Sequence, residues 1–223
     1  MQQGTGVAVG TVGTAPATSS MTSPAGGMVS PEYVASQEQL FYLSEKMLAF
    51  SSDDFNIKDI SGHTVFKVDA ALLSIKGARA LTDAFKHTIL TMQHKLLGAG
   101  TWSILRGNAS TNETLAVVKK PHGLGKMLSS SHQGPVVTVH FSHTMALGTH
   151  AQPDMVITGD VMGKGYTITQ GSTLVAEVSR ALALNTSKFK LSGKDAYAVK
   201  VAAGHDCAFV LALAVIIDEL YHD

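Results

Sequence analysis

The chain has 223 residues, and its 17 lysines and arginines balance its 17 aspartates and glutamates, giving a formal net charge of zero at pH 7. This length suits one domain with a tail, and the balanced charge argues against binding nucleic acid through a general positive field. The single cysteine excludes an intramolecular disulfide, and no basic segment followed by an apolar run opens the chain. We therefore expect a cytoplasmic protein, with a nuclear location or attachment to a membrane surface as alternatives.

Residues 1–30 are rich in glycine, serine, threonine, alanine and proline and contain no charged residue. A segment of this composition cannot bury enough apolar surface to offset the entropy lost on ordering it. The sequence therefore predicts a disordered tail over residues 1–30 and a folded domain over residues 31–223.

The first clear hairpin signal lies in residues 55–68. Phe55 and Ile57 fall on one face of a strand, while the polar residues beside them fall on the other. The tetrapeptide DISG at residues 59–62 provides a turn, and the same alternation resumes after it. This pattern predicts two antiparallel strands joined by a short turn.

Similar short segments of β-branched and apolar residues recur along the rest of the chain, separated by polar or glycine-containing turns. They predict strands within residues 81–94, 102–106, 115–119, 136–141, 155–161, 166–169, 174–178, 188–191 and 196–201. A sheet of this size tends to curl or close, because closure removes its exposed edges.

Residues 207–217 form a continuous apolar run, CAFVLALAVII, near the C-terminus. A helix that is apolar on all sides must be buried all round, and roughly 11 residues span about 16 Å, far less than the ~30 Å hydrocarbon core of a bilayer. We therefore expect this helix inside a soluble fold. Its expected core residues are Phe209, Leu211, Leu213, Val215, Ile216 and Ile217.

These elements together predict a mainly β fold, a closed antiparallel barrel of about twelve strands that encloses the hydrophobic C-terminal helix. A barrel with this number of strands has a lumen wide enough to hold a helix. A β-sandwich with the helix packed on one side is the alternative, because the number of strands alone does not distinguish the two folds.

Residue types that commonly carry catalysis or bind metals do not form a recognisable motif in this sequence. His140 and His143 differ by an odd number, so on one straight strand they would point to opposite faces. Cys207 lies in the apolar run, where a thiolate is not stabilised, and Asp206 before it is better explained as the N-cap of the helix. We therefore expect no enzymatic activity, no cofactor and no metal site.

One basic cluster is present, in residues 119–126. Lys119, Lys120 and Lys126 lie in or next to a loop, and Arg106 ends the preceding strand. Such a loop could bind an anionic lipid headgroup, with these four residues as its contacts. The alternative is a solvated loop that keeps a strand edge in water.

The order of several segments resembles that of the plant LURP-one-related family over residues 37–222. The segments are DISG at 59–62, VFKV at 65–68, KLL at 95–97, Trp102, RG at 106–107 and DCAFVLALAVIIDE at 206–219. One departure follows Asp83, where the chain has Ala84, Phe85 and Lys86 while the family tends to place glycine.

The resemblance implies the tubby C-terminal-like fold, shared with tubby proteins and phospholipid scramblases, in which about twelve strands enclose a C-terminal helix. It also implies a role in plant defence or stress signalling, and the related tubby proteins bind phosphoinositides. Our first hypothesis is a non-enzymatic module that binds phosphoinositide or another anionic membrane lipid. The alternative is a protein-interaction scaffold, and the sequence leaves the oligomeric state open.

Overall fold

The computed structural model describes residues 27–44, 55–69, 77–95, 100–108, 113–120, 137–146, 152–180 and 196–222. Most of the predicted tail and the strand predicted at residues 188–191 lie outside the described residues.

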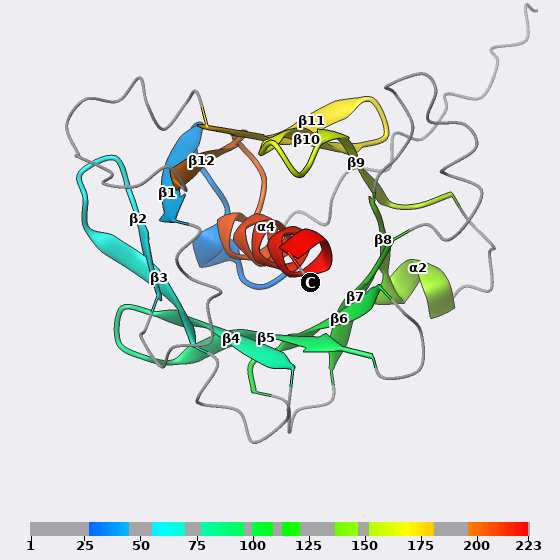
Figure 1. Ribbon diagram of the computed structural model, residues 1–223. Helices are drawn as coiled ribbons and strands as arrows, with labels where there is room; N and C mark the ends of the chain where they lie inside the picture. Colours follow the sequence, from blue (N-terminus) through cyan, green and yellow to red (C-terminus); the bar gives the residue numbers. More distant parts are fainter. Residues whose placement is uncertain are drawn as a thin grey trace, which may run out of the picture.

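The described residues form twelve strands that close into one antiparallel barrel in chain order, with β1 beside β12 (Figure 1). The strands are β1 (Gln39–Ser44), β2 (Phe55–Lys58), β3 (Thr64–Asp69), β4 (Ala78–Asp83), β5 (Thr88–His94), β6 (Thr101–Arg106), β7 (Thr114–Lys119), β8 (Val137–Phe141), β9 (Met155–Asp160), β10 (Gly165–Gln170), β11 (Thr173–Ser179) and β12 (Ala196–Val201). A closed antiparallel barrel is therefore confirmed, and the β-sandwich alternative is wrong.

Alternation of side chains places apolar residues inside the barrel wall. In β3, Phe66 and Val68 are buried while Lys67 between them reaches the outer face. The predicted hairpin is confirmed, because Ile57 of β2 pairs with Phe66 and Asn56 pairs with Lys67. Closure is uneven: β1 makes six residue pairs with β12 but one pair with β2, between Tyr42 and Lys58.

The C-terminal helix α4 (Cys207–His222) runs through the middle of the barrel (Figure 1). The six residues predicted as its core are each at most 1% exposed, which confirms that the helix is buried all round. The helix continues to His222, five residues beyond the apolar run, and its partly buried Glu219 and Tyr221 lie near the end of the barrel. Within the described part of the chain, no helix combines the length and apolar character needed to cross a bilayer.

Two ends of the barrel are distinguished by the direction of α4. We call the end at which α4 begins the base and the end at which it stops the top. Asp206 caps α4 at the base, where its Oδ1 accepts a hydrogen bond from Phe209 N at 3.0 Å, as the sequence predicted.

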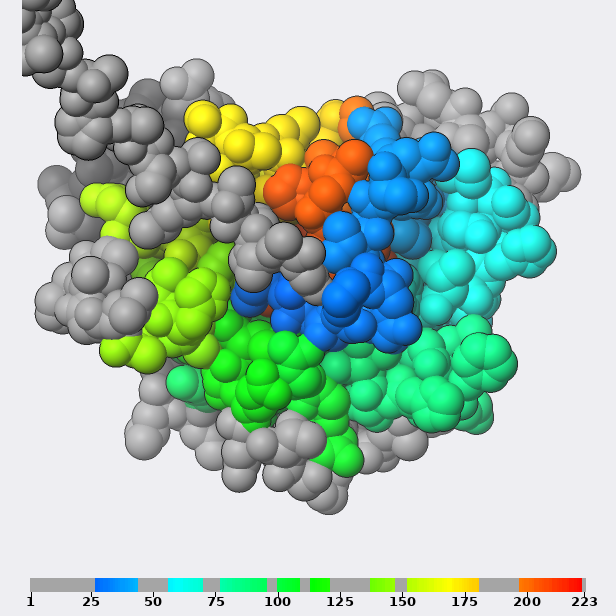
Figure 2. Space-filling model, turned by 180° about the vertical axis from the view of Figure 1, so that it is seen from behind, coloured from blue at the N-terminus to red at the C-terminus, as the bar shows by residue number. Residues whose placement is uncertain are grey.

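The segment before β1 closes the base. Val29 N donates to Asp206 Oδ2 at 2.8 Å, and Val29 is buried although the sequence assigned it to the tail. The 3-10 helix η1 (Pro31–Tyr33) follows, and Ala35 N donates to His205 O at 2.9 Å. Figure 2 views this end, with the blue N-terminal residues packed against the green strands.

Candidate functional site

Lys119 is the predicted site residue that is most accessible. It ends β7 at the top of the barrel, pairs with Thr101 of β6 and is exposed. Lys95 lies at the same level, because its backbone N donates to Thr101 O at 2.9 Å. The two lysines therefore leave the outer face of the wall in one row, about 10 Å apart at the backbone, which is two strand spacings.

Lys120 has a different role, because it binds the C-terminal turn of α4. Its Nζ donates to Leu220 O at 3.3 Å and lies 4.0 Å from the centre of the Tyr221 ring. A cation at this point satisfies a carbonyl that the helix itself leaves unpaired and interacts favourably with the negative end of the helix dipole. Lys120 thus holds the helix in place.

Arg106 lies at the base, at the other end of the β6–β7 hairpin from Lys119. Its Nε donates to Glu113 Oε2 at 2.9 Å, and its terminal nitrogens donate to Val29 O and, at 3.1 Å, to Met28 O. The structure therefore does not bring Arg106 together with Lys119 and Lys120. Arg106 anchors the segment that closes the base, and Lys126 lies outside the described residues.

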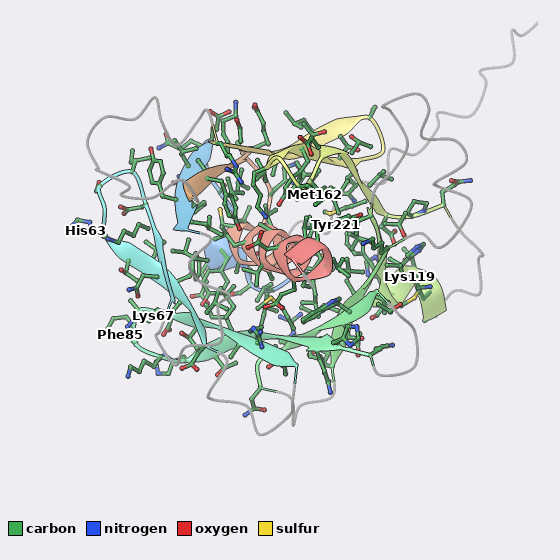
Figure 3. The ribbon with its side chains drawn as sticks, viewed as in Figure 1. His63, Lys67, Phe85, Lys119, Met162 and Tyr221 are labelled. Atoms are coloured by element: carbon green, nitrogen blue, oxygen red, sulfur yellow. The ribbon has the colours of Figure 1, made fainter. Side chains whose placement is uncertain are left out.

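Two further cations contact the last turns of α4 at the top. Lys164, in the turn between β9 and β10, forms an ion pair with Asp218, and both side chains are 1% exposed. Arg79 of β4 donates from Nε to Glu219 Oε1 at 2.8 Å. With Lys120, these residues hold the end of the helix from three different elements, and Figure 3 places Tyr221 at that end.

The side chains weighed for other chemistry lie in environments that shift their pKa values. Burial, and then the charge of Asp206, raises the pKa of the Cys207 thiol to about 12, so the thiol stays protonated at neutral pH. Burial and the nearby Lys119 charge lower the pKa of His140, although Asp154 acts in the opposite direction. Among the described residues, no three His, Cys, Asp or Glu side chains gather closely enough to hold a metal ion.

The charges of the described residues are unevenly divided along the chain, which the balanced total conceals. The described residues of β2–β7 and their connections, which we call the basic half, contain eight lysines and arginines against four aspartates and glutamates, a balance of +4. The remaining described residues contain three against eight, a balance of −5, or −4 without the buried Lys164, Asp206 and Asp218. Counting the charges segment by segment in the sequence, instead of summing them over the whole chain, would have revealed this uneven division.

The lysines of the basic half are also better exposed than those elsewhere. Within the described residues, none of its six lysines makes an ion pair. Lys120 binds the end of α4, and the other five lie on the outer face or in its turns, namely Lys58, Lys67, Lys86, Lys95 and Lys119. On the other half, Lys164 is buried against Asp218, and Lys200 pairs with Glu177 at 3.1 Å. The hydrogen bond and charge of Glu177 raise the pKa of Lys200.

An antiparallel barrel filled by its own C-terminal helix defines the structural class of this protein. A profile of the LURP-one-related family matches residues 39–218, and the chain belongs to this family.

Proteins of Arabidopsis thaliana provide the comparisons. The chain is 24% identical over 196 residues to Protein LURP-one-related 10, covering 86% of this chain and 95% of that one, and 24% identical over 203 residues to Protein LURP-one-related 15, covering 89% and 88%. A crystal structure of a protein from the same plant matches with a TM-score of 0.63 at 21% identity, covering 87% of this chain and 98% of that one. That likeness supports the fold.

Proposed function

We propose that this protein is a non-enzymatic binding module that attaches to membranes containing anionic lipid, such as a phosphoinositide, with its basic half facing the bilayer. The observation that carries the proposal is the separation of charge between the two halves of the described barrel. A role in defence or stress signalling, which the family resemblance implies, belongs to the same proposal.

The interior of the barrel favours a ligand on the outer wall. Helix α4 occupies the lumen, and the cavity beside its first turn, lined by Asp206, Phe209 and Val210 among others, has a volume of about 20 Å³. That volume suits about one water molecule and no lipid or substrate. Binding through the outer wall therefore agrees best with the packing.

The strength expected from the lysines follows from their number. A lysine near an anionic bilayer surface contributes about 1 kcal/mol, which is roughly a fivefold change in affinity. Lys58 and Lys67 on the outer face together should therefore contribute about 20-fold to 30-fold. Because the interaction is between exposed charges, it should weaken as salt rises and the Debye length falls from about 10 Å at 0.1 M.

Vesicle co-sedimentation of the full chain tests the proposal. We expect binding to phosphatidylcholine vesicles that contain phosphatidylserine or a phosphoinositide, and little binding to phosphatidylcholine alone. The double variant Lys58→Gln, Lys67→Gln should bind less. Lys200→Gln, on the other half, is the control, because it also removes a positive charge. Equal binding of the unmodified chain to neutral and anionic vesicles, or none to either, would contradict the proposal.

A further inference from the structure

Two hairpin turns of the basic half, one between β2 and β3 and one between β4 and β5, repeat the same arrangement. In residues 59–63, Asp59 Oδ1 accepts hydrogen bonds from Ser61 N at 2.8 Å and His63 N at 3.0 Å. In residues 83–87, the equivalent oxygen of Asp83 accepts from Phe85 N and His87 N, both at 2.8 Å. We call residues 59–63 and 83–87 the twin turns.

The twin turns lie next to each other at the base. Strands β3 and β4, which follow the first turn and precede the second, are neighbours in the wall, with Phe66 paired to Asp83. In each turn the aspartate N donates to the histidine O at 3.0 Å, and the residue before the histidine donates to the aspartate O. These hydrogen bonds make both turns rigid. The backbone N–H groups that donate them have their partners within the turn and do not need water as a partner.

Apolar side chains stand at the tips of both turns. Phe85 is 82% exposed and Ile60 is 56% exposed, and Figure 3 shows Phe85 directed away from the barrel on the same side as His63 and Lys67. Two large apolar side chains on adjacent turns are more than the scattered exposed residues of an ordinary surface. Convex tips of this kind fit the interfacial layer of a bilayer, into which apolar side chains enter by about 5–10 Å.

The second turn places a lysine where the backbone favours glycine. Lys86 has φ of 69°, and its equivalent in the first turn, Gly62, has φ of 83°. A residue with a side chain is strained in this left-handed region, whereas glycine is not. Lys86 is thus a strained cation directly beside Phe85, and strain of this kind is a reason to look for function.

The charges around the tips have a small positive balance. Lys58, Lys67 and Lys86 are three cations against the carboxylates of Asp59 and Asp83, a balance of +1, with His63 and His87 beside them. Both carboxylates accept hydrogen bonds within the turns, which do not remove their charge, and Asp83 Oδ2 lies 2.9 Å from His87 Nδ1. Burial acts to raise the pKa of Asp83, but the hydrogen bonds from His87 and Phe85 outweigh it and lower the pKa.

From these observations we infer that the twin turns are the membrane-contacting edge of the protein, with Phe85 and Ile60 entering the interface of an anionic bilayer and Lys58, Lys67 and Lys86 contacting its headgroups. This inference rests on the proposed function and adds to it the surface and the apolar part of the contact. A convex apolar tip beside cations favours a bilayer over a protein surface, which would need a complementary groove.

Four variants of the full chain test the inference by binding to phosphatidylcholine vesicles containing phosphatidylserine. Phe85→Ala with Ile60→Ala should weaken binding at least about tenfold, because the lost apolar area is that of two large side chains. Met162→Ala, which removes a 67% exposed side chain from the β9–β10 turn at the top, is the matched control and should bind normally. Both changes are at exposed positions, so folding should be unaffected.

Lys86 gives a sharper test, because two effects of one change should have opposite signs. Lys86→Gly should raise the midpoint of urea unfolding by relieving the strained backbone, yet weaken vesicle binding about fivefold by removing a charge. Lys86→Arg should keep the binding.

The results separate the inference from the proposed function. If the unmodified chain does not bind anionic vesicles, the proposed function is wrong and the inference is wrong with it. If the chain binds them but the Phe85→Ala, Ile60→Ala variant binds equally well, the proposed function stands and the inference is overturned. The twin turns would then serve a protein partner or none.

Discussion

Lys86 and Gly62 occupy equivalent positions of the twin turns, with φ of 69° and 83°. Replacing Lys86 by Gly should raise the free energy of unfolding by about 1 kcal/mol, because glycine enters the left-handed region without steric cost. The reciprocal change, Gly62→Lys, should lower it by a similar amount. Urea unfolding of both variants measures these effects. Equal destabilisation by the two changes would show that Lys86 makes stabilising contacts that exceed its strain.

Cys207 offers a second residue-scale prediction, because it is the chain's single cysteine and is buried at the start of α4. Burial and the Asp206 charge raise its pKa to about 12, so thiolate is scarce at pH 8. A water-borne disulfide reagent should modify the native protein very slowly, and one thiol per chain should react rapidly in urea. Rapid modification of the folded protein would contradict the observed packing of the first turn of α4.

At the scale of the elements, the position of α4 depends on buried charges at the top of the barrel. Lys164 and Asp218 form an ion pair in the interior, and Lys164 Nζ lies 5.4 Å from the centre of the Tyr197 ring. Removing one member of such a pair leaves the other charge buried without compensation. The pair therefore restricts which substitutions α4 tolerates, even if it adds little net stability.

Asp218→Ala should lower the free energy of unfolding by about 3–5 kcal/mol. Adding Lys164→Met should recover much of that loss, since both charges are then absent. Glu177→Gln, which breaks the more exposed pair with Lys200, should change stability by less than about 1 kcal/mol and serves as the control. Denaturant unfolding of the four proteins checks the prediction. An Asp218→Ala variant as stable as the control would contradict it.

The sequence predicted the elements better than their contacts. Alternation identified strands such as β3, because one face of each strand is buried, and the unbroken apolar run identified α4. The partners of Lys120 and Arg106 depend on which residues meet across 100 and 77 positions of the chain, respectively. Local patterns carry no such information, so the predicted grouping of Arg106 with the lysines could not be checked in advance.

The twin turns, in contrast, could have been recognised from a repeated pattern in the sequence. An aspartate is followed four residues later by a histidine at residues 59–63 and again at residues 83–87. The repeat shows that both turns can use the same hydrogen bonds. The exposure of Phe85 and Ile60 needed the structure, because an apolar residue in a turn can equally pack inward.

For the whole molecule, the division into a basic half and a more acidic remainder matters more than the total charge of zero. A separated charge orients a protein at a charged surface, whereas the same charges evenly mixed would not. The basic half should therefore face an anionic bilayer and the opposite half should face away. The twin turns lie at the base of the basic half, so attachment should bring that edge closest to the lipid.

Site-specific fluorescence on vesicles measures this orientation directly. Because Cys207 is buried, an environment-sensitive thiol-reactive dye can be attached to the Ile60→Cys variant or, as a control, to the Met162→Cys variant. On adding vesicles that contain phosphatidylserine, we predict a blue-shifted and brighter emission from the dye at position 60 and no change from the dye at position 162. Unchanged emission at position 60, or a larger shift at position 162, would contradict the account.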